Sequence, residues 1–190
     1  MELLKQVILE KGDTLGTEIV KVDNFLNHQI DVELIEKMGE EFYKLFSSER
    51  VTKVLTVEAS GIAIAYPVAK LFKVPLLFAK KGKPKNIGND VYSADVYSFT
   101  KDTTYGVFVS KKYLGPEDSI LIIDDFLANG QASIGLINIC EQAGAKIAGI
   151  GIAIEKQWQR GSDILRKQNH RVESLAIIEK IENDRPIFAN

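Results

Sequence analysis

The sequence has little of what disulfides, metal centres and membrane spans require. Cys140 is the single cysteine, and the two histidines, His28 and His170, lie far apart. An intrachain disulfide or a cysteine- or histidine-based metal site is therefore not expected. No stretch approaches the roughly 18 consecutive apolar residues of a spanning helix, and charges interrupt residues 1–12 (MELLKQVILEKG), unlike a signal peptide. We expect a cytoplasmic protein with no membrane partner.

A basic surplus is also lacking. Lysine and arginine total 24 against 26 acidic residues, a formal net charge of −2. Proteins that bind nucleic acids normally carry an excess of positive charge, so we expect no nucleic-acid partner. A GxxxxGK[ST] phosphate loop is absent. Gly149 and Gly151 supply only a fragment of GxGxxG, which lies inside a predicted strand and is not interpreted as a nucleotide site.

The remaining composition fits one α/β domain. The chain has 190 residues, of which 45% are hydrophobic and 26% charged, enough for one buried core and too few for two domains of ordinary size. Buried strands alternating with helical patterns predict a mostly parallel central sheet with helices on both faces. These strands are predicted at residues 53–57, 75–79, 119–123, 147–154 and 171–178.

Two segments depart from this alternation. Residues 1 to about 30 precede it, with a predicted helix over 1–11 and a short strand over 18–22, and we expect them to form a small hood over the sheet edge. Asp31 then predicts the N-cap of a long amphipathic helix. Residues 80–104 begin with a lysine- and glycine-rich stretch and continue as alternating residues that predict a hairpin with 105–110.

Residues 120–133 (ILIIDDFLANGQAS) carry the clearest chemical signal. A buried strand brings Asp124 and Asp125 to its carboxyl end, where ligands gather in open α/β sheets. A short loop with Gly130 follows, and the next helix begins near Gln131. The free N–H groups and positive dipole end of that helix suit a phosphate, while the carboxylates suit hydroxyl groups beside it. An acidic pair alone would be interpreted as a cap of the next helix.

This run resembles the motif for 5-phosphoribosyl 1-pyrophosphate (PRPP) in the type I phosphoribosyltransferases. The resemblance implies their fold, with a small N-terminal hood and a flexible hairpin lid over about 83–104. It also implies that Asp124 and Asp125 bind the ribose hydroxyls and act in catalysis. The 5-phosphate would be bound by the five loop residues Ala128, Asn129, Gly130, Gln131 and Ala132.

The loop departs from many relatives, which carry threonine at the positions of Asn129 and Ala132. The hypoxanthine-guanine branch carries aspartate at the position of Ala128, where a carboxylate lies near N7 of the base. The sequence ANGQA resembles instead the bacterial xanthine branch of the family. The implied base is therefore xanthine.

The resemblance also implies pyrophosphate contacts. These involve the loop residues Ala59, Ser60 and Gly61, which relatives often place after a non-proline cis peptide, and the basic residues Lys80 and Lys81, with Lys80 also assigned to catalysis. An ordinary strand-to-helix turn explains the loop equally well without the PRPP motif. Lys83 and Lys85, in the adjoining loop, are interpreted as solvated lysines.

Base contacts follow from the same resemblance. Val20 and Asn27 match purine-contacting positions of the hood, Phe126 would pack on the purine face, and Lys156 would meet an exocyclic oxygen. Glu155 is expected to point to the same rim as Lys156. Trp158 is interpreted either as a second stacking residue or as part of the core.

The activity implied is transfer of the phosphoribosyl group of PRPP to N9 of xanthine, giving xanthosine 5′-monophosphate and pyrophosphate in purine salvage. Mg²⁺ is the implied cofactor, held mainly by PRPP and water, and a homodimer is the implied assembly. Other bases, namely hypoxanthine-guanine or adenine, are the nearest alternatives. A non-catalytic PRPP-sensing regulator is the alternative of another class, although the roughly 30 residues before the sheet are too few for a winged helix. A PRPP synthetase-like activity would need an ATP site that the sequence lacks.

Overall fold

A central sheet organises the chain in this computed structural model, which describes residues 1–82, 90–98 and 102–189. Within those residues the sheet has eight strands in the order β10-β9-β8-β7-β3-β4-β6-β5, and β1 pairs with β2 separately. The strands are β1 (Asp13–Leu15), β2 (Ile19–Lys21), β3 (Lys53–Val57), β4 (Leu76–Lys81), β5 (Val91–Ser98), β6 (Thr103–Ser110), β7 (Ser119–Leu127), β8 (Lys146–Lys156), β9 (Val172–Glu182) and β10 (Arg185–Phe188).

The five central strands β4, β3, β7, β8 and β9 are parallel, while β10 and the β5–β6 hairpin add antiparallel edges. The mostly parallel sheet predicted from the sequence is confirmed. β8 and β9 are longer than predicted, and β10 was missed. Pro186 lies in β10, and proline is depleted in strands except at edges, which is where β10 lies.

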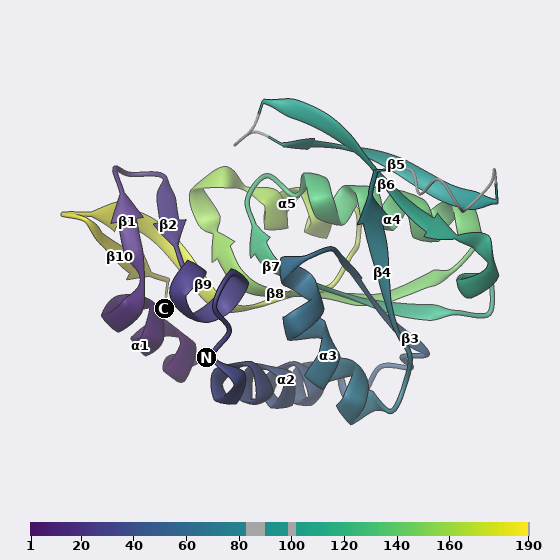
Figure 1. The fold of residues 1–190 in the computed structure, drawn as a ribbon, viewed down its shortest axis with the longest axis horizontal. Coiled ribbons are helices and arrows are strands. Elements are labelled where there is room, and N and C mark those ends of the chain that lie inside the picture. Colours follow the sequence, from purple (N-terminus) through teal and green to yellow (C-terminus); the bar gives the residue numbers. More distant parts are fainter. Residues whose placement is uncertain (83–89, 99–101, 190) are drawn as a thin grey trace.

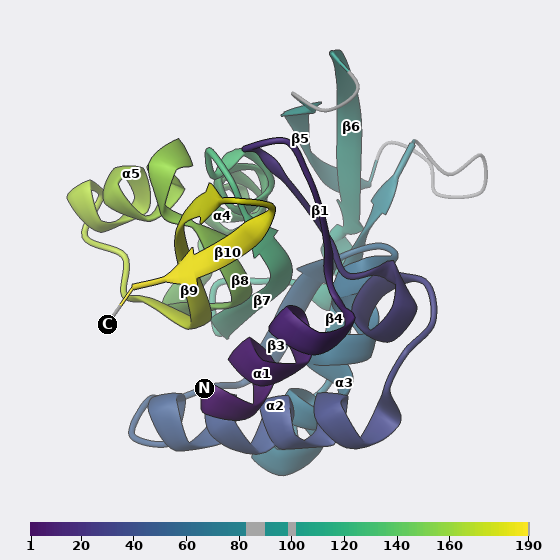
Figure 2. The same cartoon turned by 90° about the vertical axis from the view of Figure 1, so that its left-hand side faces the viewer.

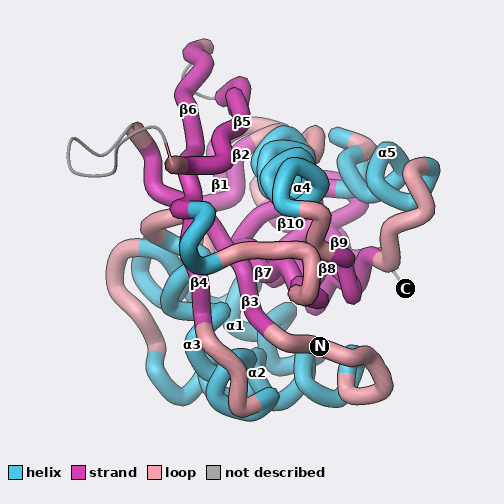
Figure 3. The backbone as a smooth tube through the Cα atoms, turned by 90° about the vertical axis from the view of Figure 1, so that its right-hand side faces the viewer, coloured by secondary structure: helices cyan, strands magenta, loops and turns pink. Residues whose placement is uncertain are grey.

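Helices cover both faces of the sheet (Figures 2 and 3). They are α1 (Glu2–Lys11), α2 (Val32–Phe46), α3 (Ser60–Phe72), α4 (Gln131–Ala143) and α5 (Gly161–Lys167), with short turns η1 (Asp23–Asn27), η2 (Lys111–Tyr113) and η3 (Gln157–Gln159). Helices α1, α2 and α3 share one apolar cluster with the sheet, and α4, α5 and the β5–β6 hairpin share the other. Among the described helices, none has both the length and the apolarity to cross a bilayer.

The N-terminal residues lie at the β9–β10 side of the sheet (Figure 1). The terminal amine donates to the Leu175 carbonyl, and the Thr14 hydroxyl donates to the Asp184 carbonyl over 2.7 Å. The predicted N-cap is confirmed, because Asp31 accepts a hydrogen bond from the Leu34 amide at 3.2 Å. The turn η1, which follows β2, lies beside the carboxyl end of β7, because Asn27 donates to Asp125 at 3.4 Å.

The predicted hairpin is confirmed as β5 and β6, and it rests on α4. A Cβ on Gly135 would lie 2.6 Å from Cγ2 of Val96, so a side chain there would push the hairpin off the helix. Gln142 donates to the Ser93 carbonyl at 2.8 Å. The residues expected to form the lid, about 83–104, are only partly described, and Lys83 and Lys85 lie outside the described residues.

Gly149 and Gly151 have a packing role in β8. A Cβ on Gly149 would lie 2.4 Å from the Phe46 ring, and one on Gly151 would lie 2.8 Å from the Phe42 ring. Both phenylalanines belong to α2 and are fully buried. The glycines therefore let α2 lie directly on the sheet, which explains why the GxGxxG fragment has no nucleotide-binding context.

We predict that Gly149→Ala lowers the free energy of unfolding by about 1–3 kcal/mol, the usual cost of overpacking a core. Gly115→Ala is the matched control, because a Cβ there meets no atom within 4 Å, and we expect it to change stability by less than about 0.5 kcal/mol. Urea unfolding of the two variants measures both values. Equal stability of the two variants would contradict the packing role.

Candidate active site

Strand β7 carries the acidic pair toward the carboxyl edge of the sheet. The strand continues through both aspartates to Leu127, so the pair belongs to the last residues of the strand and does not follow it. Asp124 is 3% exposed, and its Oδ1 accepts a hydrogen bond from the Asp125 amide at 3.0 Å. Burial, and then the negative charge of Asp125, raise the pKa of Asp124 well above its ordinary value.

The turn after β7 leads directly into α4. Gly130 has a φ of +83°, a conformation that favours glycine. The first helical hydrogen bond runs from the Ile134 amide to the Gly130 carbonyl at 2.9 Å, so the amides of the first turn have no partner within the helix. All five predicted loop residues line one cavity of about 190 Å³. Amides, helix dipole and open space together suit a phosphate group.

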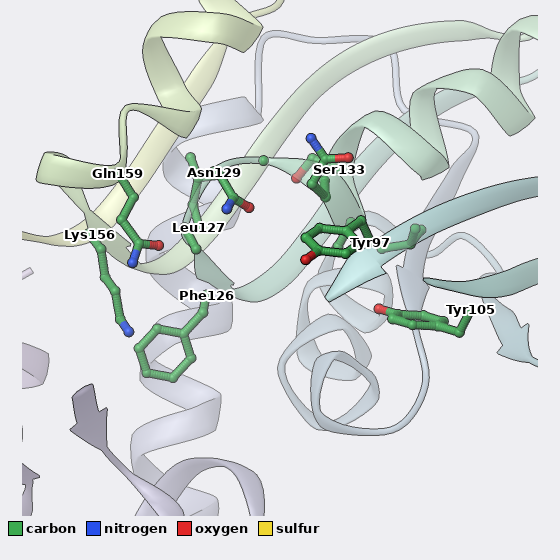
Figure 4. A pocket seen from close by; sticks show the side chains of 13 residues that line it. Tyr97, Tyr105, Phe126, Leu127, Asn129, Ser133, Lys156 and Gln159 are labelled. Carbon is green, nitrogen blue, oxygen red and sulfur yellow. The ribbon is translucent and has the colours of Figure 1, made fainter. Parts of the chain in front are cut away.

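The cavity has two further walls (Figure 4). One comes from the hairpin and contains Tyr97, whose hydroxyl donates to Asp102, and Tyr105. Burial, followed by the charges of Asp124 and Asp125, raises the pKa of Tyr105. The opposite wall contains Phe126, Lys156 and Gln159. The cavity is therefore bounded by the loop at Gly130 and by aromatic and polar side chains on its other walls.

Three of these lining residues, Tyr97, Tyr105 and Gln159, were not singled out from the sequence. The alternating pattern predicted the hairpin, but the position of the hairpin over α4 depends on the sheet order. Gln159 lies in η3, just beyond the end of β8. The only available signal was that η3 follows a strand whose carboxyl end lies at this edge.

The start of α3 meets Asp124 from the other side. Ala59, Ser60 and Gly61 form the turn between β3 and α3, and the peptide between Glu58 and Ala59 is cis. A Cβ on Gly61 would lie 1.9 Å from Oγ1 of Thr56 and 3.3 Å from Oδ1 of Asp124. Two strand-to-helix turns thus lie beside Asp124: the turn at Gly61, and the loop that directly follows β7.

The side chains of the two predicted lysines at the end of β4, Lys80 and Lys81, point to different sites. The ammonium of Lys81 lies 5.2 Å from the centre of the Tyr105 ring, and its charge acts on Asp124. Its backbone amide donates to Oε1 of Glu58 at 2.6 Å. Neighbouring strand residues point to opposite faces, and Lys80 lines a separate hollow with Phe78 and Tyr113. The structure brings Lys81, and not Lys80, to the acidic pair.

The predicted base contacts gather next to the same pair. The ammonium of Lys156 lies 5.7 Å from the Phe126 ring centre and donates to the Glu18 carbonyl at 2.9 Å. Burial lowers the pKa of Lys156. Asn27 donates to Oδ2 of Asp125 at 3.4 Å. Val20 is 7% exposed and belongs to the apolar cluster on which Phe126 packs, without lining the cavity itself.

The structure overturns one expectation for the end of β8 and decides another. Glu155 does not point to the rim with Lys156; it is 2% exposed and faces the interior, because adjacent strand residues point to opposite faces. Trp158 packs against the apolar cluster of α1, α2 and α3 and does not line the cavity. The core interpretation of Trp158 therefore holds.

Comparisons with known proteins agree with this geometry. The family model described as "Phosphoribosyl transferase domain" matches residues 21–186. The chain is 56% identical to the xanthine phosphoribosyltransferase of Ruminiclostridium cellulolyticum over 99% of each chain. It is 50% identical to that of Clostridium novyi over 100% of each chain.

Solved structures show the fold at much lower identity. Adenine phosphoribosyltransferase from Trypanosoma brucei matches with a TM-score of 0.75 and 14% identity, over 92% of this chain and 78% of that one. The Rhodothermus marinus enzyme of the same name matches with a TM-score of 0.73 and 19% identity, over 94% and 100%. Because the family model and the full-length relatives both match, the chain belongs to the phosphoribosyl transferase family, alongside proteins named xanthine phosphoribosyltransferase.

Proposed function

We propose that the protein transfers the 5-phosphoribosyl group of PRPP to N9 of xanthine, giving xanthosine 5′-monophosphate and pyrophosphate in purine salvage. One observation carries the proposal: the amide-lined turn at Gly130 opens on one cavity, and it directly follows the strand that carries the acidic pair. The full-length relatives with 50–56% identity support xanthine as the base.

In this proposal the acidic pair binds the ribose and the loop binds the 5-phosphate. Asp124 and Asp125 accept hydrogen bonds from ribose hydroxyls, and residues 128–132 donate to the phosphate. The purine nitrogen then attacks C1 as pyrophosphate leaves. Holding both reactants converts a two-body encounter into a positioned one, which accounts for several kcal/mol of barrier lowering in favourable cases. The protein needs no covalent intermediate for this reaction.

For the base, we propose that Phe126 packs on the purine face and Lys156 donates to an exocyclic oxygen. An ammonium suits an oxopurine and finds no acceptor at the amino group of adenine. The Asn27 amide offers both a donor and an acceptor to the base edge, and Val20 supports the hood beneath it. The contact of the Lys156 ammonium with the Phe126 ring supports this role.

For the pyrophosphate, we propose backbone contacts from residues 59–61 and a cationic contact from Lys81. Both groups adjoin Asp124, whereas Lys80, the residue that the sequence favoured for catalysis, lies on the opposite face of β4. Positive charge and aligned amides would stabilise the negative charge that develops on the leaving group. We assign the cationic contact with pyrophosphate to Lys81 because its ammonium lies beside the Tyr105 ring.

We also propose that Mg²⁺ enters with PRPP. Among the described residues no cluster of three or more metal-binding side chains occurs, and the half-buried Asp125 is the accessible carboxylate of the pair. That donor set fits an ion held mainly by PRPP oxygens and water. When bound, Mg²⁺ neutralises charge on the pyrophosphate; the chain itself orients the ribose.

The remaining proposals rest on the family resemblance. They are a cytoplasmic homodimer and a single domain over residues 1–190, with a hood over about residues 1–30, a core over about 31–190, and a lid over about 83–104 within it. Closure of the lid would exclude water from the reaction.

The first prediction concerns the base. With PRPP and Mg²⁺, we expect xanthine to be used with a kcat/KM at least about 100-fold above that of adenine, because a site built around a donor rejects a base that lacks its acceptor. A spectrophotometric panel of xanthine, guanine, hypoxanthine and adenine measures the ratios. Preference for adenine would reject the role of Lys156, and absence of turnover with every base would favour a PRPP-sensing protein.

A second prediction concerns Asp124. Its folded pKa lies above the unfolded value, so unfolding releases a proton, and the native state loses stability as pH rises from about 4 toward the folded pKa. Asn keeps an acceptor for the Asp125 amide without the charge. We therefore expect Asp124→Asn to raise the melting temperature relative to wild type, with a gain that grows as pH rises from about 4. The same variant should lower kcat/KM for PRPP by at least about tenfold, the effect of one charge-assisted hydrogen bond.

Calorimetry between acid and neutral pH and steady-state kinetics measure the two effects. A melting temperature below wild type at neutral pH would contradict the cost of burying Asp124. Unchanged PRPP kinetics would remove Asp124 from the ribose site.

A third prediction uses the adjacent lysines as a matched pair. Lys81→Ala should raise the KM for PRPP by about tenfold or more through loss of a charged contact to pyrophosphate, whereas Lys80→Ala should raise it less. Kinetics of the two purified variants at fixed ionic strength decide this, with melting temperatures as the check on folding. A larger effect of Lys80→Ala would reverse the assignment.

A further inference from the structure

Glu155 is a buried carboxyl group that the proposed chemistry does not use. It is 2% exposed, and both of its oxygens accept hydrogen bonds from hydroxyl groups. The Ser162 hydroxyl donates to Oε1, and the Ser174 hydroxyl donates to Oε2 over 2.6 Å. Across the described ranges, no lysine or arginine forms an ion pair with Glu155. A buried acid without a cation is costly and requires a reason for its position.

The contact with Ser162 leads to the loop at Gly130. Gly161, the neighbour of Ser162, donates its amide to the Ala128 carbonyl at 3.0 Å. A Cβ on Gly161 would lie 2.3 Å from that carbonyl oxygen and 2.9 Å from the Gly130 nitrogen. The start of α5 therefore lies directly against the backbone of the turn that precedes α4.

The contact with Ser174 connects the carboxyl group of Glu155 to strand β9. Ser174 lies in β9, and it faces Ile152 of β8 in the parallel register of the sheet. Ser174 is thus part of the rigid sheet, whereas Ser162 belongs to the segment after η3. Glu155 joins the two through one carboxyl group. Gln159, which lines the cavity, lies in the η3 turn between Glu155 and Ser162.

We propose that Glu155 is a positioning residue: through Ser162 it holds Gly161 against the 5-phosphate loop and so sets the shape of that loop. The inference rests on the proposed binding of PRPP at this loop. Gly161 is the close-packed support, and Ser174 anchors the carboxyl group to the sheet. A loop held from behind needs less ordering when the phosphate binds, which favours tighter binding of PRPP and leaves the base contacts unchanged.

Ser162→Ala and Ser174→Ala form a matched pair for the test. Each removes one hydroxyl from the same carboxyl group, on the loop side or on the sheet side. We expect Ser162→Ala to raise the KM for PRPP about fivefold, the effect of one ordinary hydrogen bond, while the KM for xanthine changes less than about twofold. Ser174→Ala should produce less than about a third of that change.

Gly161→Ala tests the close contact independently, because its added Cβ meets the loop backbone. It should raise the KM for PRPP by about fivefold or more, whereas Gly115→Ala, where a Cβ meets no atom within 4 Å, should not. Melting temperatures of all four variants accompany the kinetics.

The outcomes separate the two proposals. Wild-type protein that fails to use PRPP with any base rejects the proposed function itself. Active wild type with an unchanged PRPP KM in both Ser162→Ala and Gly161→Ala overturns the positioning role. Equal rises in the KM of PRPP and xanthine, with a lowered melting temperature, also overturn it, because they indicate general destabilisation. A selective rise for PRPP supports it.

Discussion

The site depends on one constraint: a carboxyl group is buried where two strand-to-helix turns meet. Asp124 lies at 3% exposure between the turn of α3 and the turn of α4, and its pKa is raised by that burial. Burying a carboxyl group opposes folding, so its presence here calls for a functional reason. Its position places an acceptor beside two strand-to-helix turns, and the proposed function uses that arrangement for a sugar with a phosphate at each end.

Close backbone approach is the means by which this convergence is achieved. Gly61 allows α3 to begin against Thr56 and Asp124, and Gly161 allows α5 to lie against the loop before α4. At both positions even a methyl group would overlap polar atoms. The glycines in β8 act in the same way where α2 packs on the sheet. At Gly61 and Gly161 the close approach occurs at the carboxyl edge of the sheet, where the cavity also lies.

Local patterns in the sequence were sufficient for much of the fold and for the centre of the site. The β7 strand, the acidic pair and the turn at Gly130 are contiguous, so their arrangement follows from strand and helix geometry alone. What failed depended on side-chain direction or on distant packing. Lys80 and Lys81 are adjacent and chemically equal, and only the sheet shows which one faces Tyr105. Glu155 was misplaced for the same reason, and Gln159 needed the position of η3 relative to the loop.

The comparisons separate what the fold determines from what the hood determines. The solved adenine phosphoribosyltransferases share the fold at under 20% identity, whereas the full-length relatives at 50–56% identity are named for xanthine. In the function proposed above, the 5-phosphate would meet backbone amides of the turn at Gly130, which the fold itself supplies. In the same proposal the base would instead meet side chains, namely Lys156 against Phe126 and Asn27 beside Asp125. Because η1 and the β1–β2 segment lie outside the central sheet, the proposal allows base selection to change in evolution while the ribose site stays fixed.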